Sequence, residues 1–132
     1  MAGLHLEFVS PENVLFSGDV DQVDLPGIEG DLGVLPGHAP MVTTLRPGVV
    51  TIIREARREA VVVVGGFAEM GPAGLTVLAD RAVAREDFDL QSLASDIKDA
   101  EEDVADCTDD AQRDKLVRRL DQLRALQAAL AH

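Results

Sequence analysis

The chain has 132 residues, enough for one ordinary domain with a small appendage, and 46% of them are hydrophobic, which argues against a disordered chain. With a net charge of -12 and neither Trp nor Tyr, it lacks the basic surface and the stacking side chains that a nucleic acid partner requires. No apolar run reaches the length of about 18 residues that predicts a membrane-spanning helix, so we expect no direct membrane insertion. The N-terminal sequence lacks the basic flank of a secretory signal, and we expect a soluble protein that is not exported.

Cysteine and histidine usage argues against a disulfide and a metal site. Cys107 is the single cysteine, and the histidines His5, His38 and His132 have no helical or strand spacing that would present two imidazoles to one ion. We therefore expect no metal and no cofactor. The single thiol fits a reducing compartment best.

Residues 4–84 consist of short apolar runs, rich in β-branched residues and separated by Gly and Pro. In the first run Leu4, Leu6 and Phe8 alternate with other residues, which is the pattern of a strand with one buried face. Repetition of such runs at close spacing predicts an antiparallel all-β sandwich or barrel. The polar residues 54–59 separate two Val- and Ile-rich runs, and we expect them to form the tip of a hairpin.

The character of the chain changes after Arg85, because no Pro or Gly follows it. We therefore predict a β domain over residues 1–85 and a helical segment over residues 86–132. Steps of three and four between apolar residues predict two amphipathic helices. The predicted stripes are Leu90, Leu93, Ile97, Ala100 and Val104 on the first helix, and Leu116, Leu120, Leu123 and Leu130 on the second.

The two predicted helices are expected to pair as an antiparallel hairpin. Residues 107–110 supply a short connection, and Asp109 followed by Gln112 has the form of a capping box. Residues 86–110 hold eleven acidic residues and one basic residue, whereas residues 111–132 hold five basic and two acidic residues. The opposite net charges favour pairing, although a solvated helical tail explains the same charges.

Motifs of nucleophilic catalysis and phosphate binding are not recognisable in the sequence. No serine lies in a nucleophile elbow, and Gly65-Gly66 lacks the following helix and the Lys-Ser/Thr pair of a phosphate loop. This glycine pair instead predicts a β-bulge or a close approach of two backbones.

Residues 30–40, GDLGVLPGHAP, concentrate glycine and proline. Pro36 and Pro40 fix φ and remove two amide donors, so we expect a stiff loop suited to a permanent protein contact. His38 within it can act as a proton-transfer group or form a hydrogen bond that fixes a turn.

Three segments are distinctive: GIEGDLGVLPGHAPMVTTLRPG at residues 27–48, VVVVGGFAEM at residues 61–70 and LTVLAD at residues 75–80. Together they closely resemble the epsilon subunit of the bacterial F-type ATP synthase, and the likeness covers almost the whole chain. The resemblance implies a ten-stranded β-sandwich followed by an α-helical hairpin, an α+β architecture that agrees with the residue patterns. It also implies a rotor component of the central stalk with no active site of its own.

The resemblance further implies the partners of the sandwich. In this family the sandwich contacts the gamma subunit and the ring of c subunits, at the cytoplasmic face of the inner (plasma) membrane, so that ring rotation reaches the catalytic head. Asp31 is the first candidate for the ring contact, because an acid suits c-ring loops that carry basic residues. By their places in the motif, Glu29, Asp31 and His38 are expected at the c ring, with Leu32, Val34 and Leu35 buried or against gamma.

The helical hairpin of this family can rise along gamma towards the alpha and beta subunits and inhibit ATP hydrolysis. The resemblance implies that acidic loops of beta are approached by Arg113, Lys115, Arg118, Arg119 and Arg124. Some relatives bind ATP through an Ile/Leu-Asp-x-x-Arg-Ala motif, whereas residues 88–93 here read FDLQSL and lack its Arg and Ala. We therefore expect Asp89 to cap a helix, and we expect no ATP binding.

An interpretation from another class is a free-standing, nucleotide-responsive regulatory or adaptor protein. Such a protein would not co-elute with a gamma subunit, whereas a central-stalk subunit would.

Overall fold

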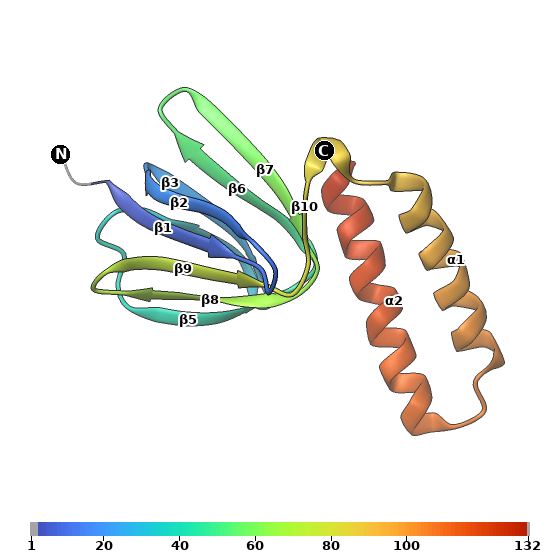
Figure 1. Ribbon diagram of the computed structural model, residues 1–132. Coiled ribbons are helices and arrows are strands. Elements are labelled where there is room, and N and C mark those ends of the chain that lie inside the picture. Colours follow the sequence, from blue (N-terminus) through green and yellow to red (C-terminus); the bar gives the residue numbers. More distant parts are fainter. Residues whose placement is uncertain (1–2, 132) are drawn as a thin grey trace. The chain divides into compact units, whose positions relative to one another are not determined.

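The computed structural model describes residues 3–131 and divides into two compact units, the first ending at Asp87 and the second beginning at Phe88. The first unit contains ten β-strands and the second contains two α-helices, as the sequence and the resemblance predict (Figure 1). Within the described residues no helix is both long and apolar enough to cross a lipid bilayer.

The first unit is a β-sandwich that ends in a short 3-10 turn, η1 (Arg85–Asp87). The strands follow the order β10-β7-β6-β3-β5-β8-β9-β1-β2, with β4 beside β3. Paired strands run antiparallel as predicted, except that β1 and β9 are parallel. The strands are β1 (Leu4–Val9), β2 (Val14–Val20), β3 (Gln22–Gly27), β4 (Gly30–Val34), β5 (Met41–Leu45), β6 (Gly48–Arg54), β7 (Arg57–Val63), β8 (Gly66–Gly71), β9 (Gly74–Ala79) and β10 (Ala82–Ala84).

The sheet folds over itself into two layers with the core between them (Figure 1). The layers are joined where Gly27 of β3 pairs with Leu45 of β5. On another side, the Arg54 guanidinium of β6 lies 5.4 Å from the centre of the Phe16 ring of β2. Each fully buried aliphatic or aromatic side chain contributes about 1.5–3 kcal/mol, so the core is the main source of the sandwich's stability.

Strand β1 shows how the sequence pattern produces this core. Leu4, Leu6 and Phe8 are at most 2% exposed, whereas the residues between them are only half-buried. The alternation therefore turns one face of the strand inward, which confirms the prediction from the first apolar run.

The predicted hairpin tip at residues 54–59 is wrong in extent. Strand β7 already begins at Arg57, so the turn consists of Glu55 and Ala56 alone, and Glu55 has a φ of 56°. Arg58 pairs with Ile53 across the ladder, which holds the charged residues in an extended conformation. The positive φ of Glu55 matches the first position of the primed turns that favour two-residue hairpin loops, so the β6–β7 ladder can continue up to this turn.

The glycine pair at the start of β8 lies against the backbone of β9. A Cβ on Gly66 would lie 2.1 Å from the carbonyl oxygen of Leu78, and the φ of Gly66 is 130°. The prediction of a close backbone approach is therefore confirmed.

The second unit is an antiparallel hairpin of α1 (Leu90–Asp106) and α2 (Asp110–Leu130), as predicted (Figure 1). The Asp89 carboxylate accepts hydrogen bonds from the amides of Gln91 and Ser92, which confirms its predicted role as a helix N-cap. Asp109 caps α2, but its carboxylate binds the amide of Ala111, where a capping box would use that of Gln112.

Burial within the helices follows the predicted stripes only in part. Leu93, Ile97 and Ala100 are buried on α1, but Leu90 is 57% exposed. On α2 the buried residues are Leu120 and Leu126, and the prediction missed Leu126. Leu126 lies three residues after Leu123 and four before Leu130, so it belongs to the same stripe, and a helix buries an arc wider than one row.

Candidate protein-interaction surfaces

The hairpin of β3 and β4 carries two of the predicted site residues at its tip. Gly27 pairs with Gly30 and Pro26 pairs with Asp31, so Ile28 and Glu29 alone form the turn. A Cβ on Gly27 would lie 2.7 Å from the carbonyl oxygen of Gly30, which explains why a glycine stands there. The expectation of a loop over residues 30–40 is wrong in its first half, because the chain enters β4 directly after this turn.

The loop proper occupies residues 35–40 and begins with a tight turn. The His38 amide donates to the carbonyl of Leu35 at 3.1 Å, and Gly37 has a φ of 82°. Pro followed by a positive-φ Gly is the type II turn pattern. The His38 Nδ1 lies 2.8 Å from the carbonyl oxygen of Ala39, so the structure shows a local hydrogen bond for this imidazole, one of the two predicted roles.

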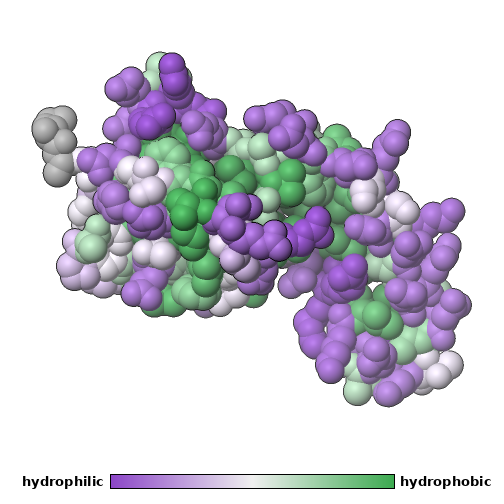
Figure 2. Space-filling model, viewed as in Figure 1, coloured by the Kyte–Doolittle hydropathy of each residue, from purple (hydrophilic) through white to green (hydrophobic). Residues whose placement is uncertain are grey.

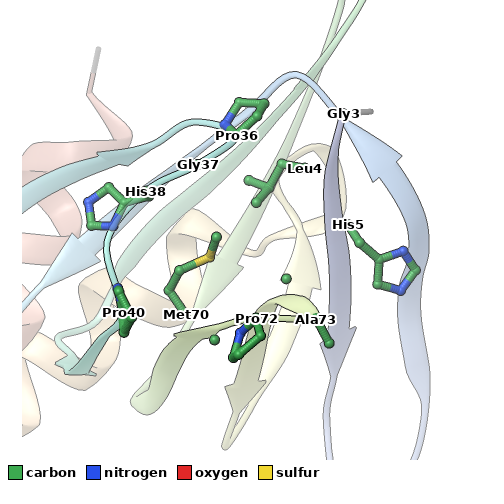
Figure 3. Close-up of a pocket in the computed structure, with 12 residues that line it drawn as sticks. Gly3, Leu4, His5, Pro36, Gly37, His38, Pro40, Met70, Pro72 and Ala73 are labelled. Atoms are coloured by element: carbon green, nitrogen blue, oxygen red, sulfur yellow. The ribbon is translucent and has the colours of Figure 1, made fainter. Parts of the chain in front are cut away.

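The structure does not bring the three predicted c-ring residues into one cluster. Glu29 and Asp31 are exposed at the tip, whereas His38 follows the opposite end of β4. His38 instead lines a hollow of about 340 Å³ with His5, Pro72 and other residues (Figure 3). A five-residue strand spans roughly 16 Å, so one small contact cannot include both places.

The apolar residues predicted beside them have three different environments. Val34 is buried in the core, Leu32 is half-buried and packs against that core, and Leu35 is 53% exposed. Alternation along β4 accounts for the first two, because residues 32 and 34 share one face of the strand.

Arg46 is a site residue that the sequence analysis missed. Its guanidinium donates through Nη1 to the Gly27 carbonyl and through Nη2 to the Asp31 carboxylate, and its amide donates to the Pro26 carbonyl at 2.9 Å. One signal could have found it: Arg46 is the only Lys or Arg among the first 53 residues, which carry seven acidic residues.

An apolar row crosses the outer face of one layer. Pairing across β5, β8, β9, β1 and β2 aligns Thr44 with Phe67, then Leu78, Val9 and Val14. Phe67 is 42% exposed and Val14 is 68% exposed. Apolar groups gather on the face of the sandwich shown in Figure 2. We name the apolar row as Phe67, Leu78, Val9 and Val14, with the exposed Ile28 and Val42 beside it.

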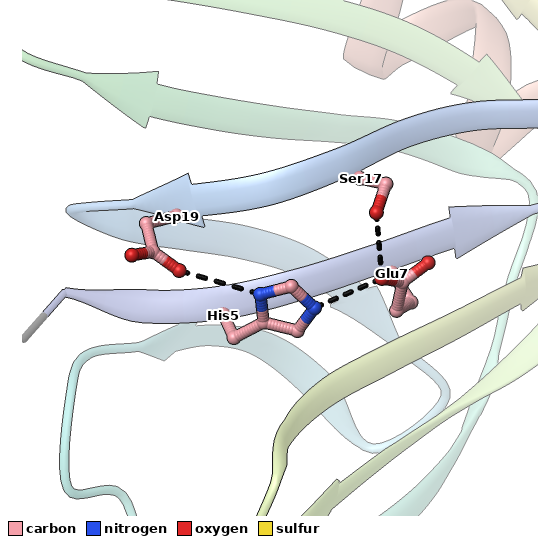
Figure 4. Close-up of polar contacts among 4 residues, drawn as sticks. All are labelled: His5, Glu7, Ser17 and Asp19. Carbon is pink, nitrogen blue, oxygen red and sulfur yellow. Dashed lines mark hydrogen bonds and ion pairs between the residues drawn. The ribbon is translucent and has the colours of Figure 1, made fainter.

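A polar cluster lies on the same layer, on β1 and β2 (Figure 4). The His5 Nε2 lies 2.9 Å from the Glu7 carboxylate and its Nδ1 lies 3.3 Å from the Asp19 carboxylate. The hydrogen bond with Glu7, followed by that with Asp19, raises the pKa of His5. The hydrogen bond from Ser17, followed by that from His5, lowers the pKa of Glu7. Ser17 donates to Glu7 at 2.6 Å, so this arrangement does not form the serine-imidazole pair of a hydrolase.

The five basic residues predicted to contact beta lie on α2 and are exposed. Arg124 already forms an ion pair with Glu101 of α1 at 2.8 Å, so it contributes to the hairpin itself. Among the described residues, no ion pair engages the other four, which are Arg113, Lys115, Arg118 and Arg119.

The described residues thus combine a sandwich that has an exposed apolar row and a polar tip with a charged helical hairpin. Within residues 3–131 no group of three or more His, Cys, Asp or Glu side chains has the arrangement of a metal site. This combination defines a protein-interaction subunit, because the exposed features are surfaces rather than a cavity with convergent reactive groups.

Comparison with known proteins identifies the family. The profile of the ATP synthase Delta/Epsilon chain β-sandwich domain matches residues 3–85. The ATP synthase epsilon chain of Maricaulis maris is 47% identical over 98% of this chain and 97% of its own length, and that of Rhodopseudomonas palustris (strain TIE-1) is 48% identical over 98% and 96%. The chain therefore belongs to the epsilon-chain family of the ATP synthase, whose members are non-catalytic accessory subunits.

A solved structure shows the same fold over nearly the full length. A chain in the mitochondrial ATP synthase of Euglena gracilis, determined as an OSCP/F1/c-ring assembly, has a TM-score of 0.84 and 27% identity. The match covers 98% of this chain and 82% of that chain. A free-standing nucleotide-responsive regulator, the alternative interpretation, is not favoured by these relatives.

Proposed function

We propose that this chain is a rotor component of the central stalk that transmits rotation of the c ring to the catalytic head. The observation that carries the proposal is the near full-length match to a chain of an assembly that contains F1 and a c ring. The proposed location is the cytoplasmic face of the membrane, where the chain associates peripherally with the complex.

The apolar row is the surface we assign to the gamma subunit. Phe67 and Val14 are exposed and Leu78 and Val9 are half-buried, so the row presents apolar surface to water. A permanent partner would remove these side chains from water, at about 25 cal/mol for each Å² buried.

The gamma contact is tested by co-elution of the purified chain with a gamma subunit. Phe67→Glu and Val42→Glu place a carboxylate in the contact and should abolish co-elution, because a charge buried without a partner is costly. Ala73→Glu makes a comparable change on the exposed turn between β8 and β9 and should leave co-elution intact. Normal co-elution of both row variants would contradict the assignment.

The hairpin tip with Glu29 and Asp31 is the surface we assign to the c ring. Both residues are exposed and held by a short, rigid turn. His38, although predicted for the same contact, lies beyond the other end of β4 and is left out of this assignment for that geometric reason.

For the helical hairpin we propose a role as a conditional brake on ATP hydrolysis. The supporting observation is that four basic side chains of α2, Arg113, Lys115, Arg118 and Arg119, are exposed and unpaired among the described residues. The proposed partners of these basic side chains are acidic loops of the alpha and beta subunits, which carry the opposite charge. Replacing all four with Gln should remove the inhibition and leave gamma binding unchanged. In the wild type, the inhibition should weaken as the Debye length falls from about 10 Å at 0.1 M salt to about 3 Å at 1 M.

A further inference from the structure

The tip of the β3–β4 hairpin has little support from its own side chains. Ile28 is 57% exposed and Glu29 is exposed, so neither packs into the core. The Ile28 amide is held by the Thr44 carbonyl at 2.9 Å, and the other backbone support comes from the ladder between β3 and β4, the pairing of Gly27 with Leu45 and the hydrogen bond from the Arg46 amide to Pro26. A turn with these contacts alone would be free to fray.

Arg46 supplies the missing support from a distant part of the sequence. It lies between β5 and β6, and its guanidinium bridges the last residue of β3, Gly27, and the second residue of β4, Asp31. One planar group therefore holds both arms of the hairpin, which is the geometry that arginine favours and lysine cannot reproduce. The Arg46 side chain is 31% exposed but the Asp31 side chain is 85% exposed, so the hold on the tip comes from the two hydrogen bonds together rather than from the ion pair alone.

The same contact changes the charge that the tip presents. The Asp31 carboxylate is paired with the Arg46 guanidinium. Glu29 has no hydrogen bond or ion pair with any described residue, so it carries the unpaired negative charge of the turn. A cationic partner side chain would therefore meet Glu29, while Asp31 is committed to Arg46.

We propose that Arg46 is a positioning residue that fixes the tip for ring docking by holding Gly27 and Asp31 together, and that Glu29 is the residue that pairs with a cationic side chain of the partner. This inference rests on the proposed contact with the c ring. It reassigns Asp31, the first candidate from the sequence, from a direct contact to a partner of Arg46.

The hold on the tip is tested in the isolated full-length chain by amide hydrogen exchange of residues 28–34. Arg46→Gln should speed exchange roughly tenfold, because it removes two hydrogen bonds that the charged guanidinium donates. Arg46→Lys keeps the positive charge but loses the planar guanidinium with its two donors. Its exchange rate should lie between those of the wild type and Arg46→Gln. Arg58→Gln removes an arginine from an exposed position of β7 and should change nothing in these residues.

The role in docking is tested by the affinity of the chain for a purified complex of gamma and the c ring that lacks this subunit. Arg46→Gln and Asp31→Asn should each weaken binding roughly tenfold, and the double variant should be no weaker than either, because both changes break one contact. Glu29→Gln should add its own loss to that of Arg46→Gln, since it acts independently.

Each failure has a separate signature. Unchanged exchange in Arg46→Gln would overturn the positioning role, and additive losses for Arg46 and Asp31 would overturn their shared action. Faster exchange with unchanged affinity in all variants would support the hold on the tip and overturn the proposed ring contact itself.

Discussion

The sandwich and the helical hairpin differ in how each is stabilised. Sixteen buried residues form one continuous core in the sandwich, whereas the two helices together bury five residues. Helices of 17 and 21 residues draw most of their stability from packing rather than from intrinsic propensity. The sandwich is therefore expected to keep one shape, whereas the surface of a partner can compete with the weaker packing of the two helices.

The largest expected effect tests the rigidity of the sandwich. Gly66→Ala places a Cβ against the Leu78 carbonyl and forces a non-glycine residue to a φ of 130°, so it should destabilise the sandwich by more than about 3 kcal/mol. Gly71→Ala is the matched control, because a Cβ there has no atom within 4 Å. Chemical denaturation measures both, and a stable Gly66→Ala variant would contradict the packing of β8 on β9.

Substitutions that create a cavity should destabilise one unit and leave the other folded. Phe8→Ala should lower the free energy of unfolding of the sandwich by about 3–5 kcal/mol, and Leu120→Ala that of the hairpin by about 2–5 kcal/mol. Far-UV circular dichroism reports the helices, and NMR of the strand amides reports the sandwich. Loss of both signals together in each variant would show that the two units unfold as one, which would contradict their separate stabilisation.

Helix capping gives a smaller effect confined to the hairpin. Asp89→Ala removes a cap that holds two amides and should cost about 1 kcal/mol, with a smaller loss for Asp109→Ala, whose carboxylate holds one. Asp99→Ala, at an exposed position within α1, should not destabilise the helix. Thermal melts followed at a helical signal rank the three variants, and equal melting temperatures would contradict the caps.

The smallest effect concerns the His5 cluster on the sandwich. The pKa of His5 is raised above its ordinary value of 6.5, so its contribution to stability is complete below that value and is lost as the pH rises through the folded-state pKa. The pKa of Glu7 is lowered below 4.5, so its contribution is complete above that value and is lost as the pH falls. Both contributions to stability are therefore complete between about pH 4.5 and pH 6.5.

His5→Gln tests this window by denaturation at two pH values. The wild type should exceed the variant in stability by more at about pH 5.5 than at about pH 8.5, because a larger fraction of the imidazole is charged at the lower pH. The exposed position of the cluster keeps the difference small. A difference that grows with pH would contradict the arrangement of His5 between Glu7 and Asp19.

The sequence predicted features that depend on neighbouring residues better than features that depend on contacts between distant parts of the chain. The alternation of Leu4, Leu6 and Phe8 and the cap at Asp89 act within a few residues, and the structure confirms both. The Arg46 contact joins residues 15 apart, with the loop between β4 and β5 in between, and no periodicity signals it.

The candidate surfaces divide in the same way. That Glu29 and Asp31 lie close together could be predicted because both belong to one motif, whereas the hairpin tip that carries them and its separation from His38 appear only once β4 is known to be a strand. The apolar row needs the register of five strands, since its members are scattered from Val9 to Leu78 in the sequence.

We propose that the sandwich couples rotation to catalysis and that the helical hairpin inhibits ATP hydrolysis. The most direct test measures ATP-driven proton pumping and ATP hydrolysis in membranes stripped of this subunit, then supplied with the full chain or with residues 1–87. Both forms should restore pumping, and hydrolysis should be faster with residues 1–87 than with the full chain. A failure of residues 1–87 to restore pumping, although they bind gamma, would contradict the role of the sandwich, and equal hydrolysis rates would contradict that of the hairpin.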